Sequence, residues 1–325
     1  MTPDPCLPAS GGTPDPSSFT LDHLIIAVRD LQAADESYRR LLGREPSWRG
    51  RHPSYGTANV LYRLDNCYLE LLAPASDGQS DSPWQRALHD RLDRAGEGLY
   101  AIALGTGDID GAVVRLRERG LAALDPAGGD GVDLDTGARR EWRNARLPVE
   151  TTRGLPAFLI EHRSPVDALP EAKPTADVDS IVLGVDHTVV ASSDLDACLA
   201  LWHETFGLDL RLTLDRPQGR RLCFLRLGDS ILELAGASGQ PRDRTSDQRP
   251  ATSAGGGSAS GGSDLLWGLA YRVGDVVRTV ERLRADGVEV SDPRPGNAPG
   301  TIVADLKPGF SHDVRTLFIQ KDAPK

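Results

Sequence analysis

Cysteine is scarce in this chain of 325 residues, and the few that occur form no pattern. The four cysteines are Cys6, Cys67, Cys198 and Cys223, and no two of them form a CxxC pair. A disulfide framework is therefore not expected. The first 18 residues also lack the basic and apolar segments of a secretory signal. We expect reduced thiols in a cytoplasmic protein.

Long apolar runs and a surplus of basic residues are missing as well. No apolar run approaches the roughly 18 residues that a membrane-spanning helix needs, so we expect no membrane partner. The 47 acidic side chains outnumber the 37 basic ones, which gives a net charge of -10. This balance argues against a nucleic-acid partner, because neutralising phosphates requires a basic face. The sequence also has no GxSxG, no P-loop and no GxGxxG after a strand.

Three low-complexity stretches divide the chain. Residues 1–18 and 238–264 are rich in small and polar residues, and we expect a disordered arm and a disordered loop there. Residues 164–182 begin with a Pro- and Ala-rich stretch that is typical of a linker. These breaks leave two domains, at residues 19–163 and 183–321.

Between the breaks, the chain repeats one unit four times. Each unit begins with an apolar strand candidate, at residues 21–28, 99–104, 185–191 and 266–273, followed by an aspartate that suits a helix N-cap. From this aspartate to the glycine that ends the helix is 13 residues in units one and three and 12 residues in units two and four. Apolar strands close the units at residues 67–74, 156–163, 230–236 and 315–320. The pattern predicts strand–helix–strand–strand–strand, four times over.

A histidine in the first strand and a glutamate in the last strand recur at matched positions. His23 and Glu70 are 47 residues apart, and His187 and Glu233 are 46 apart. Leucine flanks both glutamates, and a buried carboxylate without a partner costs several kcal/mol, so each should be paired or metal-bound. Imidazole and carboxylate together suit Zn, Fe, Mn, Ni or Co. A hydrogen-bonded structural histidine is the alternative at each position.

Other candidates lie at related positions in units two and four. Glu161 lies in its closing strand where Glu70 lies in unit one, although alone it could be a charge that faces water. Gln320 is its equivalent in unit four. Tyr100 and Trp267 take the places of the histidines, and we interpret both as cavity walls.

The repeated unit resembles the vicinal oxygen chelate superfamily, which includes glyoxalase, bleomycin-resistance proteins, methylmalonyl-CoA epimerase and extradiol dioxygenases. The segments that carry the resemblance include LDHLIIAVRDL, GTANVLYRLDNCYLELLAP, VDHTVVASSDLDACLALWHETFGLDL and FLRLGDSILELAG. The resemblance implies an α+β fold in which four βαβββ modules form two glyoxalase-like, cupped mixed sheets with helices on the outside. It leaves open whether the modules pair within the halves or across them.

The resemblance also implies a divalent metal ion in the cup. The family's ligand places fall on His23, Glu70, Tyr100 and Glu161 in the first half and on His187, Glu233, Trp267 and Gln320 in the second. Three ligands with open positions would suit a catalytic metal, as His23, Glu70 and Glu161 would provide. Pairing across the halves would instead gather Glu161 with the second-half histidine and glutamate. Trp267 and Gln320 break the ligand set of the extradiol dioxygenases, so we do not expect ring cleavage.

Three functions fit these residues. The first is a metal-dependent enzyme of the isomerase or lyase type that acts on a small oxygenated metabolite, with Glu70 or Glu161 as ligand and general base. The second is a non-catalytic protein that sequesters a small molecule, and the third is a scaffold in which only one half binds the ligand. The expected substrate cavity includes His52, Tyr100, Trp267 and Gln320, and a solvated loop histidine is the alternative interpretation of His52. Both a monomer and a homodimer remain open.

Overall fold

A computed structural model describes residues 18–75, 82–237 and 264–321. No helix within these ranges is both long and apolar enough to cross a bilayer. The expected disordered arm and loop lie outside the described residues, except for Ser18 and Asp264. The loop prediction is wrong at its last residue, Asp264. This residue is buried, and its carboxylate forms an ion pair with Arg153 at 2.8 Å.

The first domain contains two modules joined by one extra helix. Module one consists of β1 (Thr20–Ala27), α1 (Leu31–Leu42), β2 (Trp48–His52), β3 (Thr57–Arg63) and β4 (Tyr68–Pro74). The extra helix is α2 (Pro83–Ala95). Module two consists of β5 (Gly98–Gly105), α3 (Ile109–Glu118), β6 (Ala127–Asp133), β7 (Arg139–Leu147) and β8 (Ala157–His162).

The second domain follows two short 3-10 turns, at Val166–Ala168 and Val178–Ser180. Module three consists of β9 (Val182–Ala191), α4 (Leu195–Leu199), β10 (Leu210–Arg216), β11 (Arg220–Leu227) and β12 (Ser230–Ala237), with a 3-10 turn at Pro217–Gly219. Module four consists of β13 (Leu265–Val273), α5 (Val276–Ala285), β14 (Arg294–Pro295), β15 (Thr301–Asp305) and β16 (Arg315–Lys321).

The module helices begin at the aspartates that the sequence indicated. The side chain of each aspartate accepts a hydrogen bond from a backbone N–H two or three residues later in the chain. The four capping residues are Asp30, Asp108, Asp194 and Asp275. At the end of α1, Gly43 has a φ of 67°, a left-handed conformation that favours glycine. The third helix departs from the pattern, because α4 continues into a π-helical segment at Ala200–Thr205.

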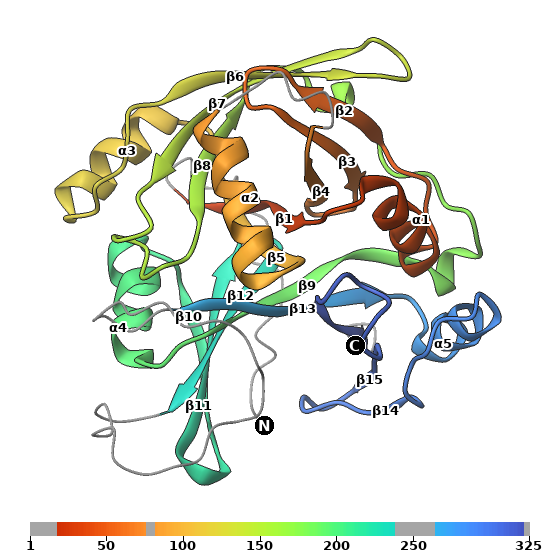
Figure 1. The fold of residues 1–325 in the computed structure, drawn as a ribbon. Coiled ribbons are helices and arrows are strands. Elements are labelled where there is room, and N and C mark those ends of the chain that lie inside the picture. Colours follow the sequence, from red (N-terminus) through yellow and green to blue (C-terminus); the bar gives the residue numbers. More distant parts are fainter. Residues whose placement is uncertain (1–17, 76–81, 238–263, 322–325) are drawn as a thin grey trace.

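The eight strands of the first domain close into a barrel in the order β1-β4-β3-β2-β6-β7-β8-β5 (Figure 1). In each module the first strand pairs in parallel with the last, as β1 does with β4 and β5 with β8. The two modules meet through the antiparallel pair β1 and β5. The barrel closes where Gly50 and Arg51 of β2 pair with β6.

The second domain forms an open sheet of eight strands in the order β10-β11-β12-β9-β13-β16-β15-β14. Its two modules meet through β9 and β13, so the modules of this protein pair within each half. Two mixed sheets with flanking helices confirm the α+β fold of four βαβββ modules. Closure of the first sheet into a barrel goes beyond the expected cup.

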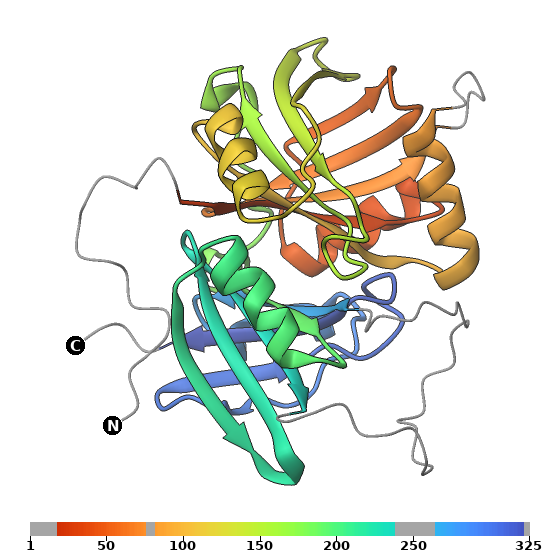
Figure 2. The ribbon, with the colours of Figure 1, turned by 90° about the vertical axis from the view of Figure 1, so that its left-hand side faces the viewer.

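The two sheets pack against each other across one shared apolar core (Figure 2). Leu24 and Ile26 of β1 belong to this core, together with Val190 of β9. Ile25 and Ala27 alternate with them and belong to a separate apolar cluster inside the barrel. Each central strand therefore has one face toward the other domain and one face toward its own sheet's concave side.

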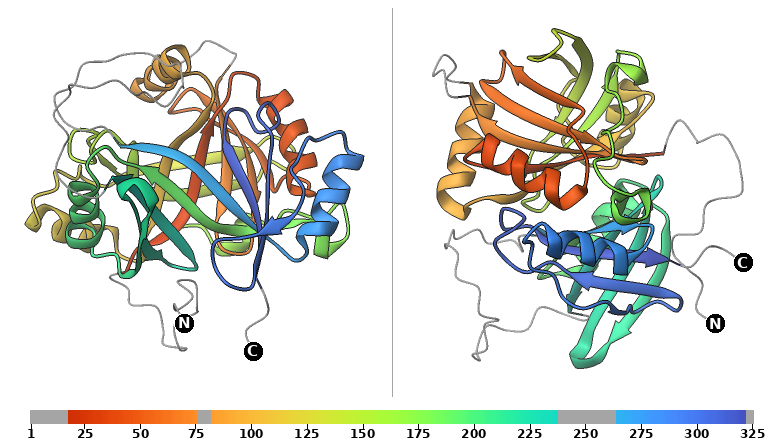
Figure 3. Two further views of the ribbon diagram at one scale, coloured as in Figure 1. Left: turned by 90° about the horizontal axis from the view of Figure 1, so that it is seen from below. Right: turned by 90° about the vertical axis from the view of Figure 1, so that its right-hand side faces the viewer.

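The four module helices flank this core in pairs, one from each domain, and the extra helix α2 lies apart from them (Figure 3). Arg282 of α5 donates to the Leu41 carbonyl near the end of α1 at 3.1 Å. Arg119, just after α3, donates to the Thr205 carbonyl beyond α4 at 3.1 Å. These contacts fix the two domains relative to each other.

Candidate active site in the barrel

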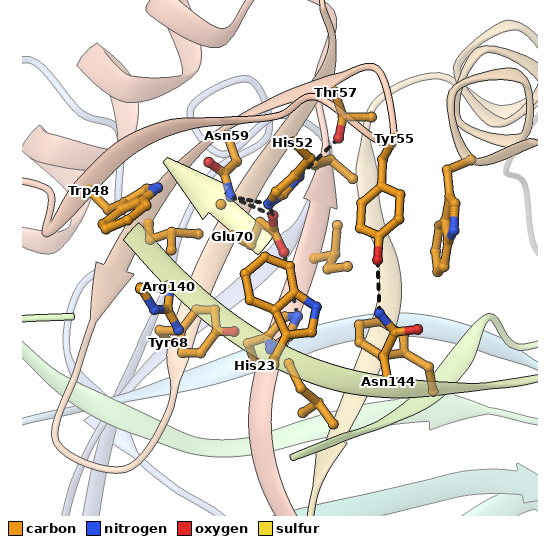
Figure 4. A pocket seen from close by; sticks show the side chains of 18 of the residues that line it. His23, Trp48, His52, Tyr55, Thr57, Asn59, Tyr68, Glu70, Arg140 and Asn144 are labelled. Carbon is orange, nitrogen blue, oxygen red and sulfur yellow. Dashed lines mark hydrogen bonds and ion pairs between the residues drawn. The ribbon is translucent and has the colours of Figure 1, made fainter. Parts of the chain in front are cut away.

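The interior of the barrel contains a cavity (Figure 4). Its empty space, counted with the part that opens to solvent, is about 730 Å³. Both modules line it, because alternate residues of a closed sheet point inward. The extra helix α2 also takes part, since Trp84 and Leu88 belong to the wall.

His23 and Glu70 meet inside this cavity from the neighbouring strands β1 and β4. His23 Nε2 lies 3.4 Å from Glu70 Oε2, and both side chains are buried. The His23 ring stacks on Tyr68, with 4.3 Å between the ring centroids, and Phe158 lies edge-on to it. The fold thus brings together two residues that the sequence separates by 47 positions.

Asp22 holds the opposite edge of the His23 ring. Its Oδ1 lies 2.6 Å from His23 Nδ1, and its Oδ2 lies 2.8 Å from Nε2 of His162 at the end of β8. Burial would raise the pKa of Asp22, but hydrogen bonds and charge from the two imidazoles outweigh it and hold that pKa well below the ordinary 3.8. An ionised Asp22 keeps a proton on His23 Nδ1. The contact between His23 Nε2 and Glu70 is then favourable when one proton lies between them.

Asn59 and His52 continue this line of hydrogen bonds along the cavity wall. Asn59 Nδ2 donates to Glu70 Oε1 at 2.8 Å and lies 3.2 Å from His52 Nε2. Since Asn59 Nδ2 is a donor, His52 Nε2 accepts, and His52 Nδ1 donates to Thr57 Oγ1 at 3.0 Å. Burial lowers the pKa of His52 against the opposing pull of Glu70, which keeps this ring neutral near pH 7.

Aromatic side chains form much of the remaining wall. They are Trp48, Tyr55, Tyr68, Trp84, Tyr100, Trp142 and Phe158. Burial raises the pKa of Tyr55 and of Tyr100, so both phenols stay protonated near neutral pH. Of the four residues expected at a substrate cavity, Tyr100 and His52 line this one.

Glu161 does not join the pair formed by His23 and Glu70. Ile160 faces the cavity from β8, so Glu161 lies on the opposite face of that strand. Its Oε2 accepts a hydrogen bond from the Ile109 N–H at the start of α3, at 3.4 Å. The expectation that Glu161 serves as ligand or base is thereby corrected, because Ile160 takes the inward position that Glu70 takes in module one.

The second domain repeats the arrangement of aspartate, histidine and glutamate. Asp186 Oδ1 lies 2.8 Å from His187 Nδ1, and His187 Nε2 lies 3.7 Å from Glu233 Oε2. Lys321 Nζ lies 2.6 Å from Asp186 Oδ2, where His162 stands in the first domain. We call Asp22–His23–Glu70 and Asp186–His187–Glu233 the first and second triads.

The other residues expected in a second-half cavity serve different purposes. Gln320 Oε1 accepts a hydrogen bond from the Val276 N–H at the start of α5, at 2.9 Å, which matches the contact that Glu161 makes with α3. Trp267 is 44% exposed and lies beneath the Arg315 guanidinium at 4.6 Å. Gln320 is therefore corrected from a cavity residue to a partner of a helix N-terminus.

The donor set expected for a metal ion does not assemble. In residues 18–75, 82–237 and 264–321, no three His, Cys, Asp or Glu side chains are arranged to hold a metal. His23 and Glu70 supply two donors, whereas catalytic zinc sites use three protein ligands. His52 Nε2 lies 4.0 Å from Glu70 Oε1, but it accepts from Asn59 instead. The residues present do not fit a resident divalent ion, and we derive no chemical step through one.

Comparison with known proteins places the chain in a family. Residues 21–185 match the model of the glyoxalase-like domain. The chain belongs to that family. Residues 186–304 match the model described as the Glyoxalase/Bleomycin resistance protein/Dioxygenase superfamily. The resemblance to the vicinal oxygen chelate superfamily is confirmed in both halves of this glyoxalase-like protein.

Curated relatives of this glyoxalase-like protein include two epimerases. The ethylmalonyl-CoA/methylmalonyl-CoA epimerase of Cereibacter sphaeroides is 36% identical over 104 residues, which are 32% of this chain and 73% of that protein. The mitochondrial methylmalonyl-CoA epimerase of Mus musculus is 33% identical over 104 residues, which are 32% of this chain. This chain spans 55% of the length of the mouse protein.

Solved structures share the whole architecture. A mutant of 4-hydroxymandelate synthase from Streptomyces coelicolor aligns with a TM-score of 0.61 at 13% identity, over 95% of this chain and 94% of that one. A hypothetical protein from Staphylococcus aureus aligns with a TM-score of 0.59 at 14% identity, over 93% of this chain and 99% of that one. At such low identity the likeness shows the fold alone. The relatives with named activities are enzymes.

Several site residues escaped the sequence reasoning, although two patterns mark them. Asp22 belongs to an Asp-His doublet that recurs in the second half at 186 and 187. On β7, Arg140, Trp142 and Asn144 alternate with outward residues and all line the cavity. The role of Asn59 had no sequence signal, because its position beside Glu70 depends on the pairing of β3 with β4.

Proposed function

We propose that the barrel cavity is an active site of the isomerase or lyase type, in which Glu70 and His23 move one proton to and from a carbon atom of a small oxygenated metabolite. The observation that carries this proposal is the contact of 3.4 Å between His23 Nε2 and Glu70 Oε2 inside the barrel cavity. A carboxylate and an imidazole in contact at the cavity surface can act as base and then as acid.

The geometry supports a division of roles within the first triad. Glu70 Oε2 takes the proton from a carbon next to an oxygenated group, and His23 Nε2 gives the proton that lay between the pair back to that carbon. The proton on Glu70 then passes to His23 Nε2, which restores the starting state. Asp22 keeps the imidazole oriented and stabilises its protonated form, as a buried carboxylate does for a catalytic histidine. Asn59 Nδ2, which donates to Glu70 Oε1, holds the carboxylate in place. The surrounding aromatic wall excludes water and so strengthens these polar interactions.

A direct test follows hydrogen exchange in heavy water. A panel of 2-hydroxy acids, 2-oxo acids, aldehydes and the corresponding amides is incubated with the protein in D2O, and proton NMR records loss of each C–H signal. We expect exchange in at least one compound and a loss of about 100-fold or more in Glu70→Gln, since a general base contributes about 100-fold to 10,000-fold. Glu233→Gln, the matched change in the second triad, should exchange at the rate of the unmodified protein. Equal exchange in the unmodified protein and Glu70→Gln would refute the proposal.

The aromatic lining supports a second function, the binding of a small molecule without reaction. Seven aromatic rings in one cavity wall provide the apolar contact area that ligand pockets use. Under this function, some compounds of the panel bind with measurable affinity and none exchanges a proton. Binding without exchange would therefore select this second function over the first.

A further inference from the structure

One cation is buried in the cavity wall without a carboxylate partner. Arg140 of β7 is 6% exposed and lines the cavity. Its guanidinium lies 5.6 Å from the Trp48 ring centroid and 5.5 Å from that of Tyr68. No Asp or Glu of the described residues lies within 4.0 Å of it as an ion-pair partner. The other buried arginine among the described residues, Arg44, donates to the carbonyls of Val182 and Ala172.

An arginine in this position is expensive unless something neutralises it. Moving a charge out of water costs several kcal/mol, and aromatic faces return only about 0.5–2 kcal/mol each. The guanidinium is also a planar fork of donors that matches the two oxygens of a carboxylate. A ligand that brings a carboxylate would therefore complete the ion pair that the chain leaves open.

The charges around the cavity indicate how much negative charge the ligand carries. Arg140 is the lone arginine or lysine among the residues that line the described cavity. Glu70 lines it as well and repels anions, and His52 stays neutral because burial lowers its pKa. One cation facing one carboxylate suits a monoanion better than a dianion such as phosphate. The aromatic wall suits an apolar or aromatic body on that anion.

We propose that Arg140 is the carboxylate-binding residue of the barrel cavity and that its ligand is a small monocarboxylate with an apolar or aromatic body. This inference deepens the function proposed above and rests on the same cavity. The carboxylate would pair with the guanidinium beside Trp48 and Tyr68, and the body would lie among the remaining rings. The atoms next to the carboxylate would then face Glu70 and His23.

Arg140 and Tyr68 also line a second hollow at the end of the barrel where β1 begins and β8 ends, together with Asp22 and His162. An anion in that hollow would face the Asp22 carboxylate and would lie outside the aromatic cavity. The two locations differ in their effect on fluorescence, because Trp48, Trp84 and Trp142 line only the inner cavity. Trp48 lies beside Arg140, which lines both hollows, so quenching that persists in Trp48→Phe reports binding in the aromatic cavity.

The test compares an acid with its neutral isostere. Phenylacetate, phenylacetamide and phenyl phosphate are titrated into the full-length protein, with tryptophan fluorescence and calorimetry as readouts. We expect phenylacetate to bind more tightly than either other probe. Arg140→Met should weaken phenylacetate at least about 10-fold, as loss of one member of a buried charge pair does, and should leave phenylacetamide unchanged. Arg140→Lys keeps the charge without the fork and should give an intermediate loss.

The neighbouring residue supplies a matched control. Arg139 is exposed and pairs with Asp130 at 3.1 Å, so Arg139→Met removes the same side chain from the other face of β7. We expect it to bind all three probes as the unmodified protein does. Thermal unfolding identifies any variant that has lost its fold, and Arg140→Lys then carries the comparison.

Three outcomes would overturn the assignment. They are equal weakening of the acid and the amide in Arg140→Met, tighter binding of phenyl phosphate than of phenylacetate, and no binding of phenylacetate at millimolar concentration. Failure of the proposed reaction gives a different result. In that case phenylacetate binding still depends on Arg140, but no compound of the D2O panel exchanges a proton. Conversely, exchange of neutral compounds that is indifferent to Arg140→Met would leave the reaction standing and remove the carboxylate site.

Discussion

The two domains carry the same triad in different enclosures. In both, an aspartate holds a histidine from behind while the ring faces a glutamate, at 3.4 Å in the first domain and 3.7 Å in the second. The His23 side chain is 3% exposed, whereas that of His187 is 17% exposed. The repeated fold therefore supplies the triad, but enclosure distinguishes the two copies.

The difference in enclosure follows from strand length and pairing. In the first domain β6 has 7 residues and pairs with β2, which closes the barrel. The corresponding strand β14 has 2 residues, and β10 and β14 remain the two edges of the open sheet. The first domain adds α2 between its modules, and the equivalent segment of the second domain lies mostly outside the described residues. A long hairpin and an added helix thus enclose one copy of a shared arrangement.

The largest expected effect separates the two aspartates. Asp22→Asn removes the charge that holds the proton on His23 Nδ1. The ring then loses its fixed orientation and the stabilisation of its protonated form, and proton transfer between His23 and Glu70 is impaired. We expect C–H exchange to fall by about 100-fold or more, which is the scale of a general acid–base contribution. Asp186→Asn should leave exchange within about twofold of the unmodified protein. Similar losses in both variants would show that the two triads act together, contrary to the comparison.

The sequence predicted the repeated architecture closely, because its signals are local. Aspartate caps, helix-ending glycines and apolar closing strands each depend on neighbouring residues, and all four modules have them. The face of β8 on which the Glu161 side chain lies could not be predicted from such local signals. It depends on which residues of β8 point into the barrel, and a shift of one residue moves a side chain to the other face.

The closure of the first sheet into a barrel could not be predicted from the sequence pattern either. Closure of the barrel depends on pairing between Gly50 of β2 and Asp133 of β6, which are far apart in the chain. Arg140 shows the same limit, because a cationic residue in a strand gives no sign of burial until the barrel is closed. The Asp-His doublet was visible in both halves, but its meaning required the contact of Asp22 with His162 from a distant strand.

A smaller effect concerns the pH dependence of stability in the second triad. Burial would raise the pKa of Asp186, but His187 and Lys321 outweigh it and lower the pKa from 3.8 to about 2. The stabilisation is therefore present above about pH 4 and lost as the pH falls toward 2, and it amounts to about 2 kcal/mol. For His187, burial lowers the pKa, while Asp186 and Glu233 raise it more, so the net shift is upward. That second contribution is complete below pH 6.5 and is lost as the pH rises through the folded value.

Urea unfolding between pH 2 and pH 8 measures both the loss of stability at low pH, which we call the acid limb, and the loss at high pH, which we call the basic limb. The unmodified protein should be most stable between about pH 4 and 6.5 with respect to this triad, and Asp186→Asn should flatten both limbs. Asp22→Asn should flatten only the acid limb that the first triad contributes, since His162 and His23 lower the pKa of Asp22. A variant whose stability falls by a constant amount at every pH would indicate lost packing rather than lost ionic contacts.

The smallest expected effect is that of metal removal. The sequence resemblance implied a divalent ion, but Ile160 faces the cavity where the set needed Glu161, and the second triad has Gln320 turned to α5. On the Nε2 side of its ring, each triad therefore offers one imidazole nitrogen and one carboxylate, because its aspartate lies at Nδ1. Two such donors make a weak site for a divalent ion. We expect dialysis against a chelator to change neither the thermal unfolding midpoint nor phenylacetate binding. Ile160→Glu restores the missing carboxylate in the first domain and should raise the zinc affinity measured by calorimetry. Val303→Glu in the second domain should not, because it places a buried carboxylate on β15 rather than on the closing strand β16. Stoichiometric metal in the unmodified protein, lost together with phenylacetate binding, would show that His23 and Glu70 recruit a further ligand and that the enclosed triad is a metal site after all.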